Sequence, residues 1–134
     1  MEMHFFIPLK KIPTVTHQEQ KVDVVNGKPR FYDSDEIKAA RGLFTAYLAQ
    51  HKPDAPLTGP IRLLTKWIYP ANNTHGPATW KTTKPDTDNM IKLFKDCMTR
   101  CIFWNDDAQV CSETTQKFYG NPAGIYVELE EITE

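Results

Sequence analysis

The sequence predicts a single α/β domain of the α+β kind, residues 1–134, in which a mixed and mainly antiparallel sheet packs against two main helices. Near the C-terminus, residues alternate in the period-two pattern of a strand with one solvated face: Ile125, Val127 and Leu129 against Tyr126, Glu128 and Glu130. Two other segments repeat apolar residues at helical spacing. A chain of 134 residues has the size of one domain.

The first half of the chain predicts three strands and one helix. In order, these are strands at Met3–Leu9, Lys21–Val25 and Lys28–Tyr32, and a helix from Asp33 to about Gln50. Asn26-Gly27, between the second and third strands, suits the positive backbone angles of a two-residue hairpin turn. Asp33 and Glu36 have the spacing of a capping box, which predicts where the helix begins.

The second half predicts a strand, a helix and two further strands. In order, these are a strand at Ile61–Tyr69, an extended segment at Ala78–Lys84, a helix at Asp88–Arg100, and strands at Ala108–Phe118 and Ile125–Leu129. The helix carries an apolar stripe formed by Met90, Leu93, Phe94, Cys97 and Cys101. Tyr119–Pro122 has the composition of a turn between the last two strands.

The composition is that of an ordinary globular protein, with 40% hydrophobic and 25% charged residues. Because no apolar run approaches the roughly 18 residues of a membrane span, and residues 1–9 do not resemble a signal peptide, we expect a cytoplasmic protein without a membrane partner. The net charge of −1 is low for a nucleic-acid-binding domain, but an acidic metal site lowers the formal total, and a bound cation restores it locally.

The most informative polar segment is Lys84–Lys92, which contains Asp86 and Asp88. On extended backbone, side chains two residues apart point to the same side, so these two carboxylates could hold one ion. Magnesium typically takes one or two protein carboxylates and fills its other positions with water and substrate phosphate. In the alternative interpretation, Asp88 caps the helix that follows and Asp86 is a turn residue; for Asp88 the two roles are compatible.

A second acidic pair, Asp106 and Asp107, follows the predicted helix. Neighbours on a strand face opposite ways, so one of the two could join the first pair, and spacing does not decide which. Lys92 lies one helical turn after Asp88, where it could form a surface ion pair or stabilise charge on a reacting phosphate. Taken together, these residues predict magnesium-dependent phosphodiester chemistry.

The order of these motifs closely resembles that of the RusA family of Holliday junction resolvases. The similarity rests on Lys84–Lys92, then Asp96, then Phe103–Val110, and the segment Pro13–Lys21 is similar to members from phages and prophages of Gram-positive bacteria. The resemblance implies that Asp86, Asp88 and Asp107 are catalytic and bind the metal, and that Lys92 is also catalytic. It implies supporting roles beside the metal for Asp106 and Asn89, and phosphate contacts for Lys81, Lys84, Lys92 and Lys95.

The function that the resemblance implies is symmetrical cutting of four-way DNA junctions by a homodimer with Mg²⁺, with Mn²⁺ as a substitute, in DNA recombination and repair. The two-fold axis of such a dimer would match the two strands to be cut. Two alternatives use the same residues: a nuclease that cuts forks and flaps during phage DNA processing, and a non-catalytic module that binds branched DNA or a metal ion. We expect an Asp86→Asn substitution to distinguish the last, because it would destabilise a structural metal site.

Overall fold

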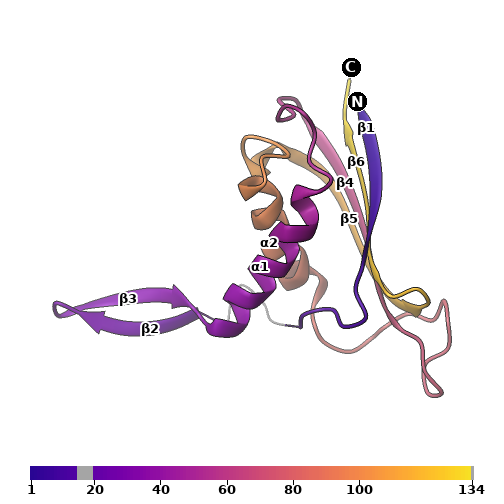
Figure 1. Cartoon of the computed structure of the whole chain (residues 1–134), viewed down its shortest axis with the longest axis horizontal. Coiled ribbons are helices and arrows are strands. Elements are labelled where there is room, and N and C mark those ends of the chain that lie inside the picture. Colours follow the sequence, from indigo (N-terminus) through magenta and orange to yellow (C-terminus); the bar gives the residue numbers. More distant parts are fainter. Residues whose placement is uncertain (15–19, 134) are drawn as a thin grey trace.

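The computed structural model describes residues 1–14 and 20–133, and it contains a four-stranded sheet in the order β1-β6-β4-β5 (Figure 1). The strands are β1 (Glu2–Pro8), β4 (Ile61–Pro70), β5 (Val110–Gly120) and β6 (Gly124–Glu131). Two of the three pairings are antiparallel, β1 with β6 and β6 with β4, whereas β4 and β5 are parallel. The predicted mixed, mainly antiparallel sheet is therefore confirmed, and its parallel pair is next to one edge.

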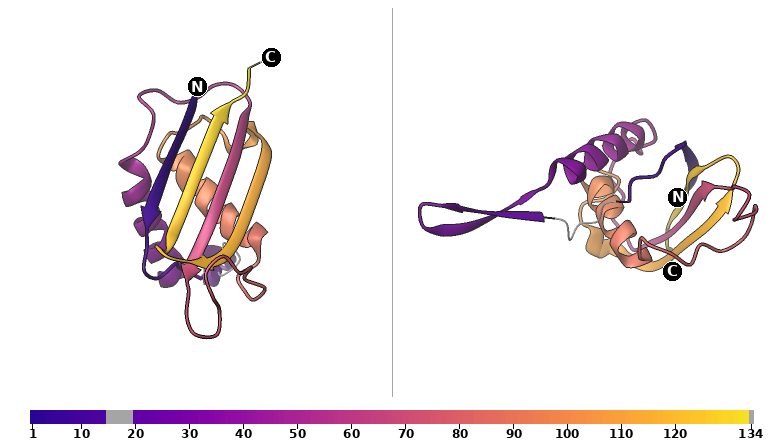
Figure 2. Two further views of the ribbon diagram at one scale, coloured as in Figure 1. Left: turned by 90° about the vertical axis from the view of Figure 1, so that its right-hand side faces the viewer. Right: turned by 90° about the horizontal axis from the view of Figure 1, so that it is seen from below.

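Two helices, α1 (Asp35–Ala49) and α2 (Thr87–Arg100), cover one face of this sheet, and the other face has no helix over it in the described chain (Figure 2, left). Of the apolar stripe predicted for the second helix, four residues are buried and Cys101, just beyond the end of α2, is half-buried. Trp67 of β4 packs edge-on against Phe44 of α1 and Phe94 of α2, with ring centroids 6.0 and 5.4 Å away. No helix of the described residues is long and apolar enough to cross a membrane.

The parallel pairing of β4 and β5 decides where the two ends of α2 lie. Parallel neighbours need a crossover connection, and here the crossover contains α2. The chain leaves β4 at Pro70, returns through α2, and enters β5 at Val110, which is paired with Ile61 at the start of β4. The N-terminus of α2 is therefore near the C-terminal end of β5, and the C-terminus of α2 is near the beginning of β5.

A two-stranded hairpin, β2 (Gln20–Val25) and β3 (Lys28–Asp33), projects away from the sheet ahead of α1 (Figure 1). Asn26 and Gly27 have φ angles of 54° and 76°, which confirms the predicted two-residue turn. Residues 15–19 and 134 lie outside the described chain, so most of the phage-like segment Pro13–Lys21 is not described.

The predicted capping box of the first helix is wrong by one residue. Ser34 is the N-cap of α1, and its hydroxyl accepts a hydrogen bond from the backbone N–H of Ile37 at 3.2 Å. The carboxylate of Asp33 instead receives a hydrogen bond from Arg41 at 2.9 Å. Aspartate and serine are both good caps, and the ion pair with Arg41, eight residues further along the chain, draws Asp33 away from that role. The extended segment predicted at Ala78–Lys84 is confirmed only in part, because Trp80 alone forms a bridge, with Phe118.

Candidate active site

Asp86 and Asp88 lie at the exposed N-terminus of α2. Asp86 is the N-cap residue, with extended angles (φ −70°, ψ 145°), and its side chain makes no capping hydrogen bond. Asp88 is already in the first helical turn, so both the expectation that the pair lies on extended backbone and the alternative that Asp88 is the cap are wrong. Both carboxylates sit where the helix dipole favours negative charge, and the oxygens of Asp86 remain available to a ligand.

The segment that leads to Asp86 is fixed to the sheet by Lys117 of β5. The Lys117 ammonium donates to the backbone carbonyls of Thr83 and Pro85 at 2.7 and 2.6 Å. The backbone N–H of Lys81 also bonds the Lys117 carbonyl at 3.2 Å. Lys117 therefore determines where α2 begins relative to β5. Sequence reasoning missed this residue, because a lysine on a strand gives no indication of which carbonyls it will reach.

The predicted DNA-contacting lysines differ in their surroundings. Lys84 and Lys92 are exposed, and Lys92 is one turn beyond Asp88 on α2. Lys95 already has a carboxylate partner, Glu113 of β5, at 2.8 Å. Lys81 donates to Thr83 Oγ1 at 2.7 Å and lies over the rings of Tyr69 and Tyr119. Lys84 and Lys92 are consequently the two most available to a phosphate, while Asn89 is half-buried in the first turn of α2.

Asp106 and Asp107 begin a short 3-10 helix, η1 (Asp107–Gln109), so the strand predicted from Ala108 starts only at Val110, as β5. Asp106 is its N-cap and accepts a hydrogen bond from the N–H of Ala108 at 2.9 Å. The Gln109 side chain completes a capping box by accepting from the N–H of Asp106 at 3.0 Å, and it donates to the carbonyls of Leu57 and Gly59. Local capping of η1 therefore prevails over the extended backbone expected here.

The two acidic groups lie at opposite ends of α2. Fourteen residues make α2 about 21 Å long. Strand β5 gives a similar separation. Lys117 of β5 contacts Pro85, the residue before Asp86, whereas Asp107 lies just before Val110, the first residue of β5. At roughly 3.3 Å per residue, Val110 and Lys117 are about 23 Å apart. In residues 1–14 and 20–133, no three Asp, Glu, His or Cys side chains are close enough to hold a metal ion. A single chain therefore does not bring Asp107 to Asp86 and Asp88.

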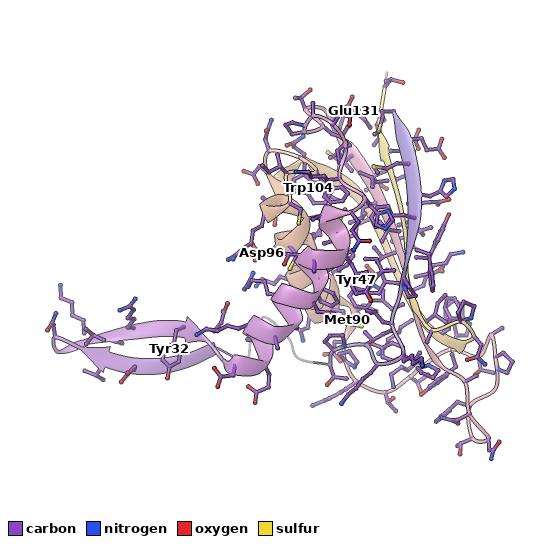
Figure 3. All side chains as sticks on the ribbon, in the orientation of Figure 1. Tyr32, Tyr47, Met90, Asp96, Trp104 and Glu131 are labelled. Atoms are coloured by element: carbon purple, nitrogen blue, oxygen red, sulfur yellow. The ribbon has the colours of Figure 1, made fainter. Side chains whose placement is uncertain are left out.

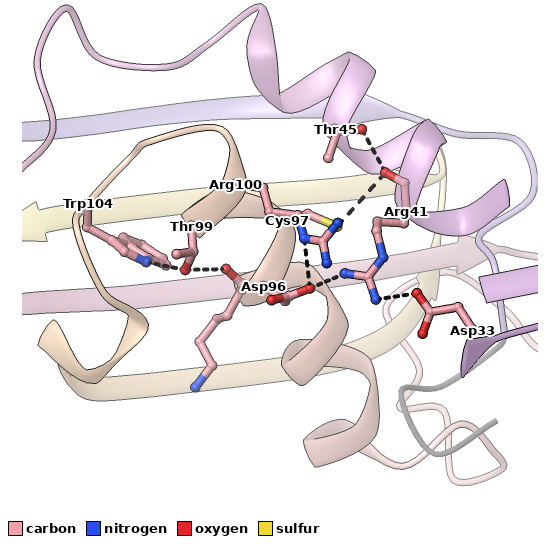
Figure 4. A network of polar contacts seen from close by, with 9 residues as sticks. Asp33, Arg41, Thr45, Asp96, Cys97, Thr99, Arg100 and Trp104 are labelled. Atoms are coloured by element: carbon pink, nitrogen blue, oxygen red, sulfur yellow. Dashed lines mark hydrogen bonds and ion pairs between the residues drawn. The ribbon is translucent and has the colours of Figure 1, made fainter. Parts of the chain in front are cut away.

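Asp96, the further aspartate of the motif, has a structural role between the helices (Figure 3). It pairs with Arg41 of α1 and, at 3.4 Å, with Arg100, while Arg41 also pairs with Asp33 at 2.9 Å (Figure 4). Burial disfavours the charge of Arg41, but its hydrogen bonds to Asp96 and Asp33 outweigh that effect and raise its pKa. This network joins the end of β3 to α1 and α2. Sequence reasoning missed Arg41, because a single arginine in an amphipathic helix does not indicate that it will be buried.

Comparison with known proteins agrees with the order of these motifs. Residues 11–130 match the family described as Endodeoxyribonuclease RusA. The chain is 30% identical over 134 residues to a protein of Lactococcus phage r1t named crossover junction endodeoxyribonuclease rusA, covering 98% of this chain and 100% of the phage protein. It is also 29% identical over 119 residues to the uncharacterized protein YqaN of Bacillus subtilis (strain 168), covering 81% and 83% of the two chains.

Proposed function

The chain belongs to the RusA family of endodeoxyribonucleases, and from this membership we propose that it resolves four-way (Holliday) DNA junctions by paired symmetrical nicks that depend on Mg²⁺. The observation that carries the proposal is the free carboxylate pair at the N-terminus of α2, with Lys92 one turn further along the helix. These groups suit a phosphodiester, because two carboxylates can bind a hard cation and a lysine can meet the phosphate it holds.

The donor set at the start of α2 fits magnesium. Mg²⁺ prefers oxygen ligands, uses few protein carboxylates and keeps positions for water and phosphate; Asp86 and Asp88 are exposed and would hold it, and Mn²⁺ would replace it on the same ligands. When bound, the cation supplies positive charge that activates water and offsets charge on the phosphate. Lys92 would add a second positive contact, and Lys84 would position the DNA backbone without reading sequence.

The separation of the two acidic groups supports a homodimer in which the metal site is shared. Asp107 is about 20 Å from the start of its own α2, so it could join Asp86 and Asp88 only across a subunit interface. Two-fold symmetry would then generate two identical sites, each with Asp86 and Asp88 from one subunit and Asp107 from the other. Two such sites suit a substrate that has to be cut in two strands.

The experiment that tests the function incubates the purified chain with labelled four-way junction, fork and linear duplex DNA, with and without Mg²⁺, beside an Asp107→Asn variant. We expect paired nicks at the junction that ligase can seal, because hydrolysis would leave a 5′-phosphate and a 3′-hydroxyl. The variant should bind the junction and not cut it.

Two other results would redirect the proposal. Equal cutting of forks and junctions would make the chain a general branch nuclease of phage DNA processing. Binding without cutting in Mg²⁺ or Mn²⁺ would favour a non-catalytic module, and in that case Asp86→Asn should lower the unfolding temperature in the presence of metal, because a structural ion stabilises the folded state.

A further inference from the structure

We propose that Gln109 is a positioning residue of the metal site: its side chain ties η1, and with it Asp107, to the segment Leu57–Gly59 that precedes β4. The inference rests on the proposed function, which assigns Asp107 to the metal. In this role Gln109 contacts neither the metal nor the DNA. It acts through the backbone of the loop that carries Asp107.

The first support is that the Gln109 amide uses its full hydrogen-bonding capacity. A primary amide has two N–H donors and an oxygen with two lone pairs. The Gln109 oxygen accepts from the N–H groups of Asn105 and Asp106 at 2.8 and 3.0 Å. Its nitrogen donates to the carbonyls of Leu57 and Gly59 at 2.9 and 3.0 Å. One half-buried side chain therefore joins the loop of η1 to a segment 50 to 52 residues away in the sequence.

The second support is that the segment Leu57–Gly59 is itself fixed to the core and to the sheet. Leu57 is buried, and its N–H bonds the carbonyl of Phe103 at 2.9 Å. The other two N–H groups of the segment both donate to the carboxylate of Glu131, the last residue of β6, at 3.0 Å. Gln109 therefore connects η1 to a point that is held from two other directions.

The third support is that η1 has few other constraints. It is three residues long, and the hydrogen bonds of a 3-10 helix have poorer geometry than those of an α-helix. The side chain of Asp106 bonds only within the loop, at the N–H of Ala108, and Asp107 is exposed. Among the described residues, Gln109 is the one member of residues 105–109 whose side chain forms hydrogen bonds outside that loop. The place of the Asp107 carboxylate therefore depends on Gln109.

The expected effect follows from what a metal ligand requires. Loss of a group that orients a ligand typically weakens metal binding about 10- to 100-fold. Gln109 acts on Asp107 through the backbone, without touching its carboxylate, so we expect the lower end of this range, about 10-fold. In the shared site, a displaced η1 would carry Asp107 away from Asp86 and Asp88 of the partner subunit.

The test compares the full chain with a Gln109→Met variant, which keeps the length of the side chain and removes its four hydrogen bonds. Electron paramagnetic resonance of Mn²⁺ should give a dissociation constant about 10-fold higher for the variant, and the Mg²⁺ concentration for half-maximal cutting should rise by a similar factor. Hydrogen exchange followed by mass spectrometry should be faster in residues 105–109. Circular dichroism verifies that the variant is folded.

The matched control is Ser34→Ala, which removes the cap of α1 and does not alter η1. It should lower the midpoint of urea unfolding and leave both metal measurements unchanged, because a loss of stability alone does not displace Asp107. A second variant, Gln109→Glu, keeps the bonds from Asn105 and Asp106 and loses the two to the segment Leu57–Gly59, because an ionised carboxylate only accepts hydrogen bonds. It should weaken Mn²⁺ binding as Gln109→Met does.

The outcomes separate the role of Gln109 from the function. If either folded variant binds Mn²⁺ as tightly as the unaltered chain, the inference is overturned, even when the unaltered chain cuts junctions. Weaker Mn²⁺ binding by the variants, with the control unchanged, supports the inference even if no cutting is seen, in which case it is the proposed function that fails. An unaltered chain that binds no Mn²⁺ overturns the inference as well.

Discussion

At the scale of the residue, Asp106 and Asp107 show how neighbouring carboxylates can differ. Both are exposed. The Asp106 carboxylate accepts a hydrogen bond from the N–H of Ala108 at 2.9 Å, whereas Asp107 is the first residue of η1 and is not its cap. The spacing of the sequence leaves the choice between them open, and the resemblance favours Asp107. Because one oxygen of Asp106 already accepts the cap hydrogen bond, we expect Asp107 to be the more available of the two to a cation.

We expect Asp106→Asn to retain both stability and cutting, because asparagine caps a helix as well as aspartate does. Asp106→Ala should lower the free energy of unfolding by about 1 kcal/mol or less, the usual effect of losing a cap. Urea titration and junction cleavage measure the two effects, with Asp107→Asn as the comparison. Full loss of cutting in a stable Asp106→Asn chain would contradict this division of roles.

Glu131 gives a pH-dependent prediction. Its carboxylate accepts hydrogen bonds from the backbone N–H groups of Gly59 and Thr58, both at 3.0 Å, and these bonds lower its pKa. A carboxyl group with a lowered pKa in the folded state contributes stability above its unfolded pKa and loses it as the pH falls through the folded value. Glu131→Gln should therefore reduce the acid-side loss of stability, measured by urea unfolding from neutral pH downward.

The control for this measurement is Glu2→Gln, at an exposed position of β1, which should leave the acid-side loss unchanged. If Glu131→Gln and the unaltered chain lose stability in parallel below about pH 5, the hydrogen bonds to Glu131 do not contribute as described.

At the scale of the element, the start of α2 is positioned by a strand to which it is not adjacent in sequence. Lys117 of β5 holds the carbonyls of Thr83 and Pro85, so the orientation of Asp86 depends on a contact more than thirty residues away. Periodicity predicted α2 and β6 well, because one face of each is buried in the core. It could not predict this contact, or the parallel pairing of β5 that makes it possible, because the contact involves hydrogen bonds between distant segments.

We expect Lys117→Met to leave the fold intact and to lower kcat/KM for junction cutting. The substitution removes the two hydrogen bonds that hold the segment before Asp86 and keeps the apolar part of the side chain. Misplacement of a reacting group by about 1 Å can lower the reaction rate by up to about 10²-fold. Lys66→Met, on the neighbouring strand β4, is the matched control, because the Lys66 ammonium lies over the ring of Tyr126 of β6. Equal activity of the two variants would show that Lys117 does not position the site.

At the scale of the whole molecule, the separation of Asp107 from Asp86 leads to a mixing experiment. In a heterodimer of Asp86→Asn and Asp107→Asn chains, a shared site arrangement leaves one site with both substitutions and the other with neither. We expect each variant alone to be inactive, and the mixture to regain cutting at one intact site per heterodimer, seen as single nicks in place of paired ones. The readout is the nicking pattern of a labelled four-way junction.

The control for mixing combines Asp86→Asn with Asp88→Asn, which alter the same half of the site. This pair should stay inactive in all proportions, because no heterodimer contains an intact site. Recovery here, or no recovery with the first pair after co-refolding, would contradict a metal site shared between subunits.

Local periodicity and turn chemistry were enough to predict the main strands, the two amphipathic helices and the hairpin turn, and residue type was enough to single out the acidic groups. The folded chain was needed to see that Ser34 caps α1, that Asp106 caps η1, and that Asp86 and Asp107 lie at opposite ends of α2. The physical reason is that the hydrogen bonds and ion pairs of a polar side chain depend on which groups lie close to it in the folded chain. The crossover between β4 and β5 determines which groups lie close to the two ends of α2.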